Sequence, residues 1–223
     1  MSVFLTIPAS NVGDSHEEQV KAVADALKGG ELVILPTDTS YALCADAFHA
    51  AAVKKLRELK GQDESISLPV AGWSIDAIRG VAQFSDVALD LAHAFWPGAL
   101  TILTRPQASL AWSLADADQV MPVRVPQHSF LKDVLQLVGP TVMTGAQRQG
   151  GSPVTVCSDT YSYGDEVSVY VDGGEASGNV STIIDASGQH LRMIRHGELS
   201  LAQLREVVPT IVDATARRDG SDS

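Results

Sequence analysis

The stretch that decides the fold reads Leu32-Val33-Ile34-Leu35-Pro36-Thr37-Asp38-Thr39-Ser40-Tyr41-Ala42-Leu43-Cys44. Its four leading apolar residues predict a buried strand, and the proline ends the hydrogen-bonded ladder because it has no N–H to donate. Five polar side chains then follow in succession before the chain becomes apolar again. Because ligands in open α/β sheets bind at strand ends, these hydroxyl groups indicate a ligand site. A polar turn between two strands would explain the same composition equally well.

The remainder of the chain alternates helical and strand patterns through its first two thirds, and strands dominate after that. This order predicts an α/β fold with a mixed sheet. Helices are expected at 17–27, 49–59, 75–82, 87–95, 130–138 and 200–207, with Ser15 as the N-cap of the first and His128 at the start of the fifth. Strands are expected at 2–7, 32–35, 68–71, 99–103, 122–126, 141–144, 167–171, 181–184 and 191–194. Without a repeat or a linker, we expect one domain at 1–210 and a flexible polar tail at 211–223.

Composition narrows the class of protein. The chain has 223 residues, of which 45% are hydrophobic, so it can bury a sizeable core. No apolar run is long enough to cross a bilayer and the N-terminus lacks a basic region, which predicts a cytoplasmic protein without a membrane partner. The net charge of −11 argues against extensive direct nucleic-acid binding. Cys44 and Cys157 are far apart and are expected to be free thiols.

Candidate site residues share one placement, because each lies where a predicted strand or helix meets a loop. Three cations and several hydroxyl groups at such positions would suit a nucleotide phosphate and a small polar substrate. The candidates are Thr37, Tyr41, Lys60, Arg124, Thr144, Ser181, Thr182 and Arg195.

Each cation also has a purely structural explanation. Lys60 could interact with the C-terminal dipole of its own helix. Arg124 and Arg195 could form structural ion pairs with aspartates that are near in sequence, namely Asp116 or Asp118 for the first and Asp185 for the second.

Familiar site signatures are missing from the sequence. It contains no G-x-x-x-x-G-K-[ST], H-E-x-x-H or G-x-S-x-G, which excludes a Walker loop, a zincin and an α/β-hydrolase. No G-x-G-x-x-G follows the first predicted strand, which argues against a dinucleotide site. No metal site is expected. The glycines between 145 and 151 would let the backbone approach a ligand closely.

Six ordered stretches resemble motifs of the YrdC-like family of L-threonylcarbamoyladenylate synthases. Residues 36–43 are similar to its P-T-D-T-V-Y-G-L, 59–61 to the start of L-K-G-R-P, 95–101 to W-P-G-P-L-T, 123–126 to V-R-x-P, 181–185 to S-T-V-V-D and 194–197 to L-R-P-G. The resemblance extends from about Ile7 to Val208. It implies a single-domain YrdC-like fold with a twisted mixed sheet, flanking helices and a concave cleft.

The resemblance also implies an activity. Enzymes of this family are nucleotidyltransferases that use ATP, L-threonine and bicarbonate to make an activated threonylcarbamoyl group for a tRNA adenosine. ATP would be a substrate accompanied by Mg²⁺, without a tightly bound cofactor, and a tRNA threonylcarbamoyl transferase complex would be a partner. Threonine-binding residues would be Thr37, Tyr41 and Ser181; ATP-binding residues would be Lys60, Arg124, Thr144, Gln147 and Arg195. No residue is assigned a catalytic role.

Several residues depart from the family motifs. The second cation of the K-x-R pair is Gln62, the next proline is Asp63, and S-A-N becomes Gly145-Ala146-Gln147. We hypothesise that Arg148, in the facing loop, restores the lost charge. Two other functions stay open: a diverged member that binds nucleotide or RNA without this reaction, and an enzyme with a different carbamoyl-adenylate substrate. Val120 and His196 are further departures.

Overall fold

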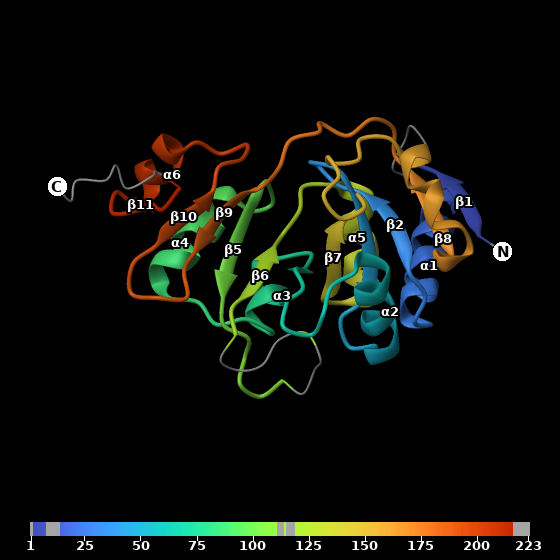
Figure 1. Cartoon of the computed structure of the whole chain (residues 1–223), viewed down its shortest axis with the longest axis horizontal. Helices are drawn as coiled ribbons and strands as arrows, with labels where there is room; N and C mark the ends of the chain where they lie inside the picture. The colour runs from blue at the N-terminus through green and yellow to red at the C-terminus, as the bar shows by residue number, and fades with distance from the viewer. Residues whose placement is uncertain (1, 8–13, 111–113, 115–118, 216–223) are drawn as a thin grey trace.

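The structure is a computed structural model that describes residues 2–7, 14–110, 114 and 119–215. The strands of this part of the chain form one mixed sheet, with the order β1-β8-β2-β3-β7-β4-β6-β5-β9-β10-β11. Figure 1 shows the two ends of the sheet at opposite ends of the molecule, with the chain termini near them. The expected α/β fold with a mixed sheet and flanking helices is confirmed.

The elements have the following bounds. The strands are β1 Val3–Thr6, β2 Val33–Pro36, β3 Tyr41–Asp46, β4 Val70–Ala71, β5 Leu100–Thr104, β6 Met121–Arg124, β7 Thr141–Gly145, β8 Val169–Asp172, β9 Thr182–Asp185, β10 Arg192–Arg195 and β11 Val212–Asp213. The helices are α1 Asp14–Lys28, α2 Ala50–Lys60, α3 Ile75–Arg79, α4 Asp86–Phe95, α5 Ser129–Val138, α6 Leu201–Val207 and the 3-10 helix η1 Cys157–Glu166.

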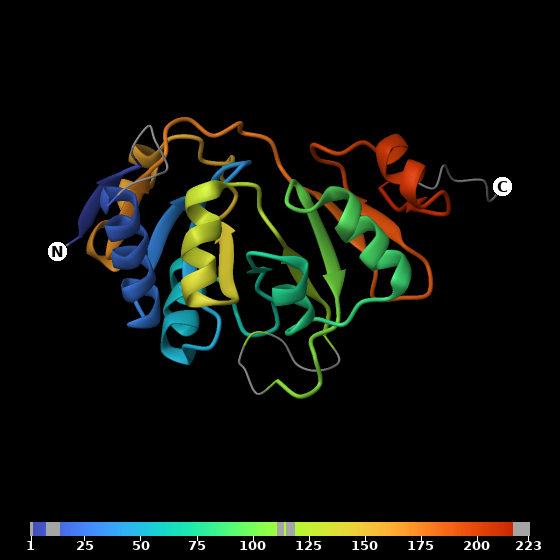
Figure 2. The same cartoon turned by 180° about the vertical axis from the view of Figure 1, so that it is seen from behind.

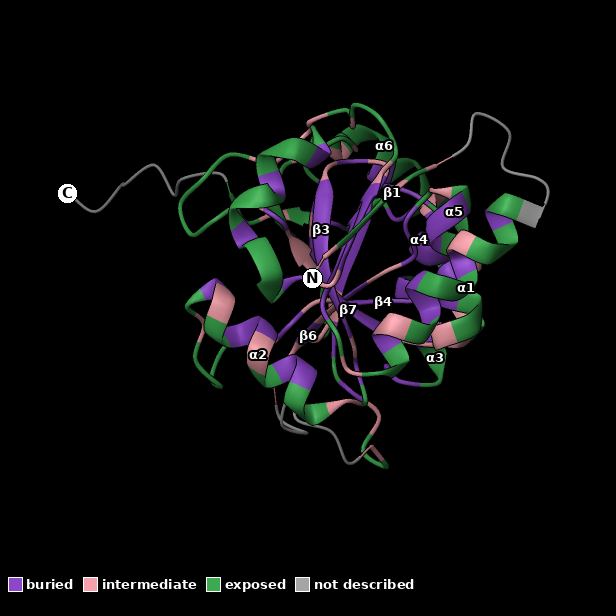
Figure 3. Cartoon of the chain, turned by 90° about the vertical axis from the view of Figure 1, so that its right-hand side faces the viewer, coloured by how far each residue is buried: buried purple, intermediate pink, exposed green. Residues whose placement is uncertain are grey.

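Helices cover both faces of the sheet. The helices α1 and α5 lie side by side on one face, in front in Figure 2, and bury Leu27, Phe130 and their neighbours against β2 and β8. On the other face, α2 packs Leu56 into a larger core with Leu43 and Val70. Each such side chain stabilises the fold by about 1.5–3 kcal/mol when fully buried. Figure 3 shows that the central strands are buried, whereas the outer surfaces of the helices are exposed.

The stretch that decides the fold is a β-hairpin. Pro36 is the last residue of β2, as the sequence predicted, and pairs with Tyr41 of β3. The backbone N–H of Thr37 donates to the carbonyl oxygen of Ser40 at 3.2 Å and closes the turn. The polar residues are therefore both a turn between two strands and, as shown below, part of a cavity wall.

Short elements account for most other differences from the expected pattern. The first helix, α1, spans Asp14–Lys28, so Ser15 lies within it and is not its N-cap. The helix expected at 75–82 ends at Arg79, and the strand expected at 68–71 is reduced to Val70–Ala71. The 3-10 helix η1 has no counterpart among the expected elements. His128 caps α5 as expected, with its Nδ1 accepting from the N–H of Leu131 at 3.4 Å.

Residues 211–213, placed in the polar tail by the sequence, contact the rest of the fold. Ile211 is buried because its apolar side chain packs into the larger core, and β11 pairs in parallel with β10. The remainder of the expected tail, 216–223, lies outside the described residues. Cys44 and Cys157 are free and buried. Within the described ranges, no helix combines the length and apolarity needed to cross a bilayer.

Candidate functional site

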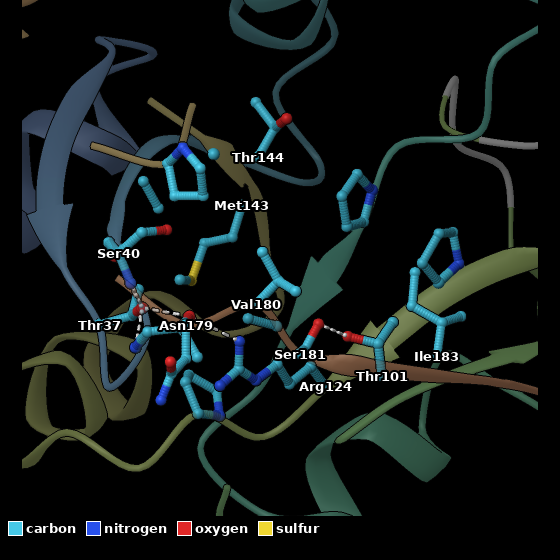
Figure 4. Close-up of a pocket in the computed structure, with 18 of the residues that line it drawn as sticks. Thr37, Ser40, Thr101, Arg124, Met143, Thr144, Asn179, Val180, Ser181 and Ile183 are labelled. Atoms are coloured by element: carbon cyan, nitrogen blue, oxygen red, sulfur yellow. Dashed lines mark hydrogen bonds between the residues drawn. The ribbon is translucent and has the colours of Figure 1, made fainter. Parts of the chain in front are cut away.

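A cavity of about 290 Å³ lies between the β2–β3 turn and the ends of the neighbouring strands. Its wall comes from the turn, the edges of β4, β6 and β7, and the β8–β9 connection. Figure 1 shows that connection crossing from one half of the molecule to the other. In Figure 4, Thr37, Arg124 and Ser181 approach the same space from three different segments. Of the nine site residues that the sequence predicted, six line this cavity: Thr37, Arg124, Thr144, Gln147, Ser181 and Arg195.

The hydroxyl group of Thr37 organises the turn. Its Oγ1 donates to the Ser40 carbonyl oxygen at 2.7 Å and accepts from the N–H groups of Thr39 and Ser40 at 3.1 and 3.2 Å. Such side-chain bonds to nearby backbone groups give the turn a fixed shape. Because its hydroxyl hydrogen is donated to the Ser40 carbonyl oxygen, Thr37 fixes the shape of the cavity wall and offers no free hydrogen-bond donor to a ligand.

Arg124 is held from three sides at the end of β6. Its Nη2 donates to both carboxylate oxygens of Asp38 at 2.7 Å, its Nε donates to the Gly98 carbonyl oxygen at 2.9 Å, and its Nη1 donates to Thr39 Oγ1 at 3.1 Å. Burial lowers the pKa of Arg124, and the charge of Asp38 opposes that shift. The guanidinium group therefore has a fixed orientation and a paired charge.

Arg195 and Ser181 form a second polar group in the cavity. The Nε and Nη2 of Arg195 donate to the Ser181 carbonyl oxygen at 3.0 and 2.8 Å, and Nη2 also donates to Ser181 Oγ at 2.8 Å. Ser181 Oγ lies 2.8 Å from Thr101 Oγ1. Burial and then the charge of Arg124 lower the pKa of Arg195. Two cations close enough to repel each other make this cavity suited to an anion.

Of the aspartates predicted as partners, Asp185 does not contact Arg195. Asp116 and Asp118 lie outside the described residues, and the partner of Arg124 is Asp38 instead. The Asp185 carboxylate accepts from the N–H and the hydroxyl of Ser187 at 3.0 and 2.6 Å, not from Arg195. Turn closure thus explains Asp185 without a ligand.

Lys60 and Tyr41 do not line the cavity. The Lys60 ammonium group donates to the carbonyl oxygens of Gly145, at 2.8 Å, and Gln147, and burial lowers its pKa. The Tyr41 hydroxyl donates to the Gly174 carbonyl oxygen at 2.6 Å, and burial raises its pKa. Both side chains therefore support segments that form the wall, which differs from the contacts with ATP and threonine that the sequence predicted.

The loop after β7 brings a carboxamide group into the cavity wall. Gln147 Oε1 is buried, with no hydrogen-bond partner in the described part of the chain. It lies where a side chain at Gly145 would begin, because a Cβ there would be 2.2 Å from this oxygen. The longer amide of Gln147 thus occupies the space left by the missing side chain of Gly145.

Arg148 and Asp63 both lie outside the cavity wall. Arg148 is exposed, lies 4.1 Å above the ring of Tyr163 and donates to the Ser162 carbonyl oxygen at 3.1 Å, so it does not restore a charge to the wall. The Asp63 carboxylate accepts from the Ser65 N–H at 2.8 Å on an exposed loop. Hydrogen bonds from Ser65 lower its pKa.

Sequence reasoning assigned no role to three residues that shape this site: Asp38, Thr101 and Asn179. Asp38 and Thr101 lie inside stretches that resemble the family motifs, and this placement could have identified them as site residues. Within the described ranges, no group of three or more His, Cys, Asp or Glu side chains is arranged to hold a metal ion. The Asp38 carboxylate is already bonded to Arg124, so magnesium here would depend on ligands supplied by a triphosphate.

Comparisons with known proteins agree with this architecture. The Sua5_yciO_yrdC family model, described as "Telomere recombination", matches residues 25–197. A Mycobacterium tuberculosis protein, provisionally named threonylcarbamoyl-AMP synthase, is 36% identical over 198 residues, covering 87% of this chain and 91% of its own. A Pyrococcus abyssi protein named threonylcarbamoyl-AMP synthase is 28% identical over 209 residues, covering 90% and 61%.

A solved structure is similar over the whole chain. The crystal structure of P. abyssi Sua5 complexed with L-threonine superposes with a TM-score of 0.86 and 25% sequence identity. The match covers 100% of this chain and 65% of that one.

Proposed function

Since the chain belongs to the Sua5/YciO/YrdC family, we propose that it is a threonylcarbamoyl-AMP synthase that uses ATP, L-threonine and bicarbonate. Curated relatives at 36% and 28% identity carry the name of this enzyme, and a structural neighbour was solved with L-threonine. Its product would serve the threonylcarbamoyl modification of a tRNA adenosine in the cytoplasm, through a tRNA threonylcarbamoyl transferase complex.

The reaction has two chemical steps. The amino group of threonine and bicarbonate form a carbamate and release water. A carbamate oxygen then attacks the α-phosphorus of ATP, a phosphoanhydride bond breaks, and pyrophosphate leaves. Negative charge builds up on the pyrophosphate, so fixed cations and hydrogen-bond donors would stabilise the transition state. Magnesium bound to ATP would share that charge.

One observation carries the proposal: Arg124 and Arg195 share a cavity with the hydroxyl-bearing residues Thr37, Thr144 and Ser181. Guanidinium groups suit carboxylates and phosphates because their N–H groups form a planar fork. The Nη1 of Arg195 has no protein partner in the described structure and is available to an anion. Hydroxyl groups around it would orient a small amino acid.

The residue roles follow from this arrangement. Thr37 and Ser181 would position threonine, whereas Arg124, Arg195, Thr144 and Gln147 would contact ATP. Lys60 and Tyr41 would act from outside the wall, by holding the loop after β7 and the β8–β9 connection.

Pyrophosphate release tests the proposal. The purified protein is incubated with ATP, L-threonine and bicarbonate, and each substrate is omitted in turn. We expect release only with all three, together with a threonylcarbamoyl-AMP product in the mass spectrum. Release that does not require threonine, or no release at all, would contradict the proposed activity.

A nucleotide- or RNA-binding protein without this reaction is the second candidate. Gln62 stands where the family has a second cation, and Lys60 is bonded to loop carbonyls. Binding measured across salt concentrations separates the cases, since RNA affinity falls steeply with salt and binding of threonine does not.

A further inference from the structure

We infer that Asp38 is a positioning residue, which holds the guanidinium group of Arg124 in the cavity wall and acts on a ligand only through it. Asp38 is absent from the cavity lining, whereas Arg124 is part of it. The inference deepens the proposed function, and its activity test rests on that function.

The geometry of the pair fixes the plane of Arg124. Both carboxylate oxygens of Asp38 lie 2.7 Å from Nη2, and the side chains of both residues are only 16% exposed. Together with the bonds to Gly98 and Thr39, these contacts engage all three nitrogen atoms of the Arg124 guanidinium group. Its orientation is therefore fixed, and its planar face remains for a ligand.

Asp38 is itself held in place from two sides. The turn that carries it is closed by the hydroxyl of Thr37. From the β8–β9 connection, Ser177 Oγ donates to the Asp38 carbonyl oxygen at 3.0 Å, and the Gly178 N–H donates to the Thr39 carbonyl oxygen at 2.9 Å. A carboxylate on such a fixed backbone can impose one orientation on its partner, which a carboxylate on a loose loop could not.

Charge balance gives Asp38 a second effect. Arg195 lies close enough to Arg124 that the positive charge of Arg124 disfavours the charged form of Arg195. Asp38 neutralises Arg124 and leaves one uncompensated guanidinium group in the wall. Glu198 also exerts a favourable field on Arg124, but its carboxylate is bonded to Asn179 Nδ2 at 3.4 Å. Without Asp38, two like charges would face each other and Arg124 would move away.

The test is a double-mutant cycle on kcat/KM for pyrophosphate release. Asp38→Asn keeps the shape of the side chain and removes its charge. In the wild-type background we expect kcat/KM to fall about 10- to 100-fold, the effect of losing a charge-assisted hydrogen bond. In the Arg124→Ala background, the same change should alter kcat/KM by less than about threefold. A residue with a merely structural role would give the same factor in both backgrounds.

Asp185→Asn is the matched control, because it makes the same chemical change at a carboxylate whose hydrogen bonds, within the described residues, come from Ser187. It should leave kcat/KM within about twofold of wild type. Circular dichroism establishes that each variant is folded. If Asp38→Asn is not, the cycle is run with Asp38→Glu, which keeps the charge but shifts the fork by one methylene group.

The outcomes separate this inference from the proposed function. Equal factors in the two backgrounds, or an unchanged kcat/KM for Asp38→Asn, would overturn the positioning role. A wild-type protein that releases no pyrophosphate would overturn the proposed function instead. In that case, the NMR signal of the Arg124 Nε–H group still tests the pair, because this group bonds to Gly98 only while Asp38 holds the guanidinium group in place. We expect its proton to be protected from exchange with solvent in the wild type, and its signal to be lost or shifted in Asp38→Asn. An identical resonance in both proteins would contradict the inference.

Discussion

Replacing Gly145 by alanine should weaken ATP binding without unfolding the protein. A Cβ at this position would lie 2.2 Å from Gln147 Oε1, much closer than two such atoms can approach. Gly145 is not among the glycines with positive φ, so alanine can adopt its backbone conformation. The atom that must move is the end of a flexible side chain, and the carboxamide of Gln147 should therefore turn out of the cavity wall.

The magnitudes distinguish stability from binding. Turning the side chain to a less favourable rotamer costs about 0.5–1.5 kcal/mol, whereas replacing glycine by alanine in a compatible conformation gains about 0.4–1 kcal/mol. The two nearly cancel, so the free energy of unfolding should change by less than about 1 kcal/mol, or about 2–4 °C in Tm. The loss of one neutral hydrogen bond to ATP is worth about 0.5–1.5 kcal/mol, or roughly 2- to 13-fold in Kd.

Calorimetric titration with ATP and thermal unfolding measure the two effects separately. Gly145→Ala and Gln147→Ala should weaken ATP binding to the same extent, and the double variant should be no weaker than either. In the Gln147→Ala background, Gly145→Ala should raise the stability by about 0.4–1 kcal/mol, because the clash is gone. Wild-type affinity in Gly145→Ala, or additive losses in the double variant, would refute this reasoning.

Three further predictions concern residues outside the cavity wall. Arg148→Ala should leave the ATP dissociation constant unchanged in a titration, because its exposed guanidinium group stacks on Tyr163 outside the cavity wall. The loss of that contact should reduce stability by only about 0.5–1 kcal/mol. A weaker ATP affinity would instead support the hypothesis that Arg148 replaces the missing cation of the family motif. Burial lowers the pKa of Lys60 in the folded protein below its unfolded value, so the contribution of Lys60 to stability is fully present above the unfolded pKa and is lost as pH falls through the folded pKa. Urea titrations at several pH values should therefore show that stability rises less steeply toward alkaline pH in Lys60→Met than in the wild type. An identical slope in the two proteins would contradict this. Burial raises the pKa of Cys44, and it raises the pKa of Cys157 to about 11. Iodoacetamide at pH 8 should therefore alkylate both thiols only after denaturation. Rapid labelling of the native protein would contradict this.

Much of the fold was predictable because it rests on local patterns. The apolar run before Pro36 and the helical spacing in α2 and α5 each identified an element from a few neighbouring residues. The strand β11 has only two residues, too few to show a period, and it forms by pairing with β10. The 3-10 helix η1 buries only Cys157, Thr160 and Tyr163, so it lacks the apolar pattern of an α-helix.

The site was predictable only in part, because its contacts cross the sheet. Six of the predicted residues meet at the cavity, which follows from their shared placement at strand ends. The partner of Arg124 could not be found by proximity in sequence, since Asp38 is 86 residues away and only the strand order brings the two together. Lys60 lies at a helix end and its long side chain reaches several acceptors; nothing local indicates that it bonds to the carbonyls of Gly145 and Gln147.

The central claim is that the cavity between the β2–β3 turn and the β8–β9 connection binds L-threonine. A crystal structure of the protein soaked with L-threonine tests it most directly. We predict threonine in this cavity, with polar atoms of threonine within hydrogen-bond distance of Ser181 or Thr37. Threonine bound elsewhere on the protein, with this cavity free of it, would contradict the account.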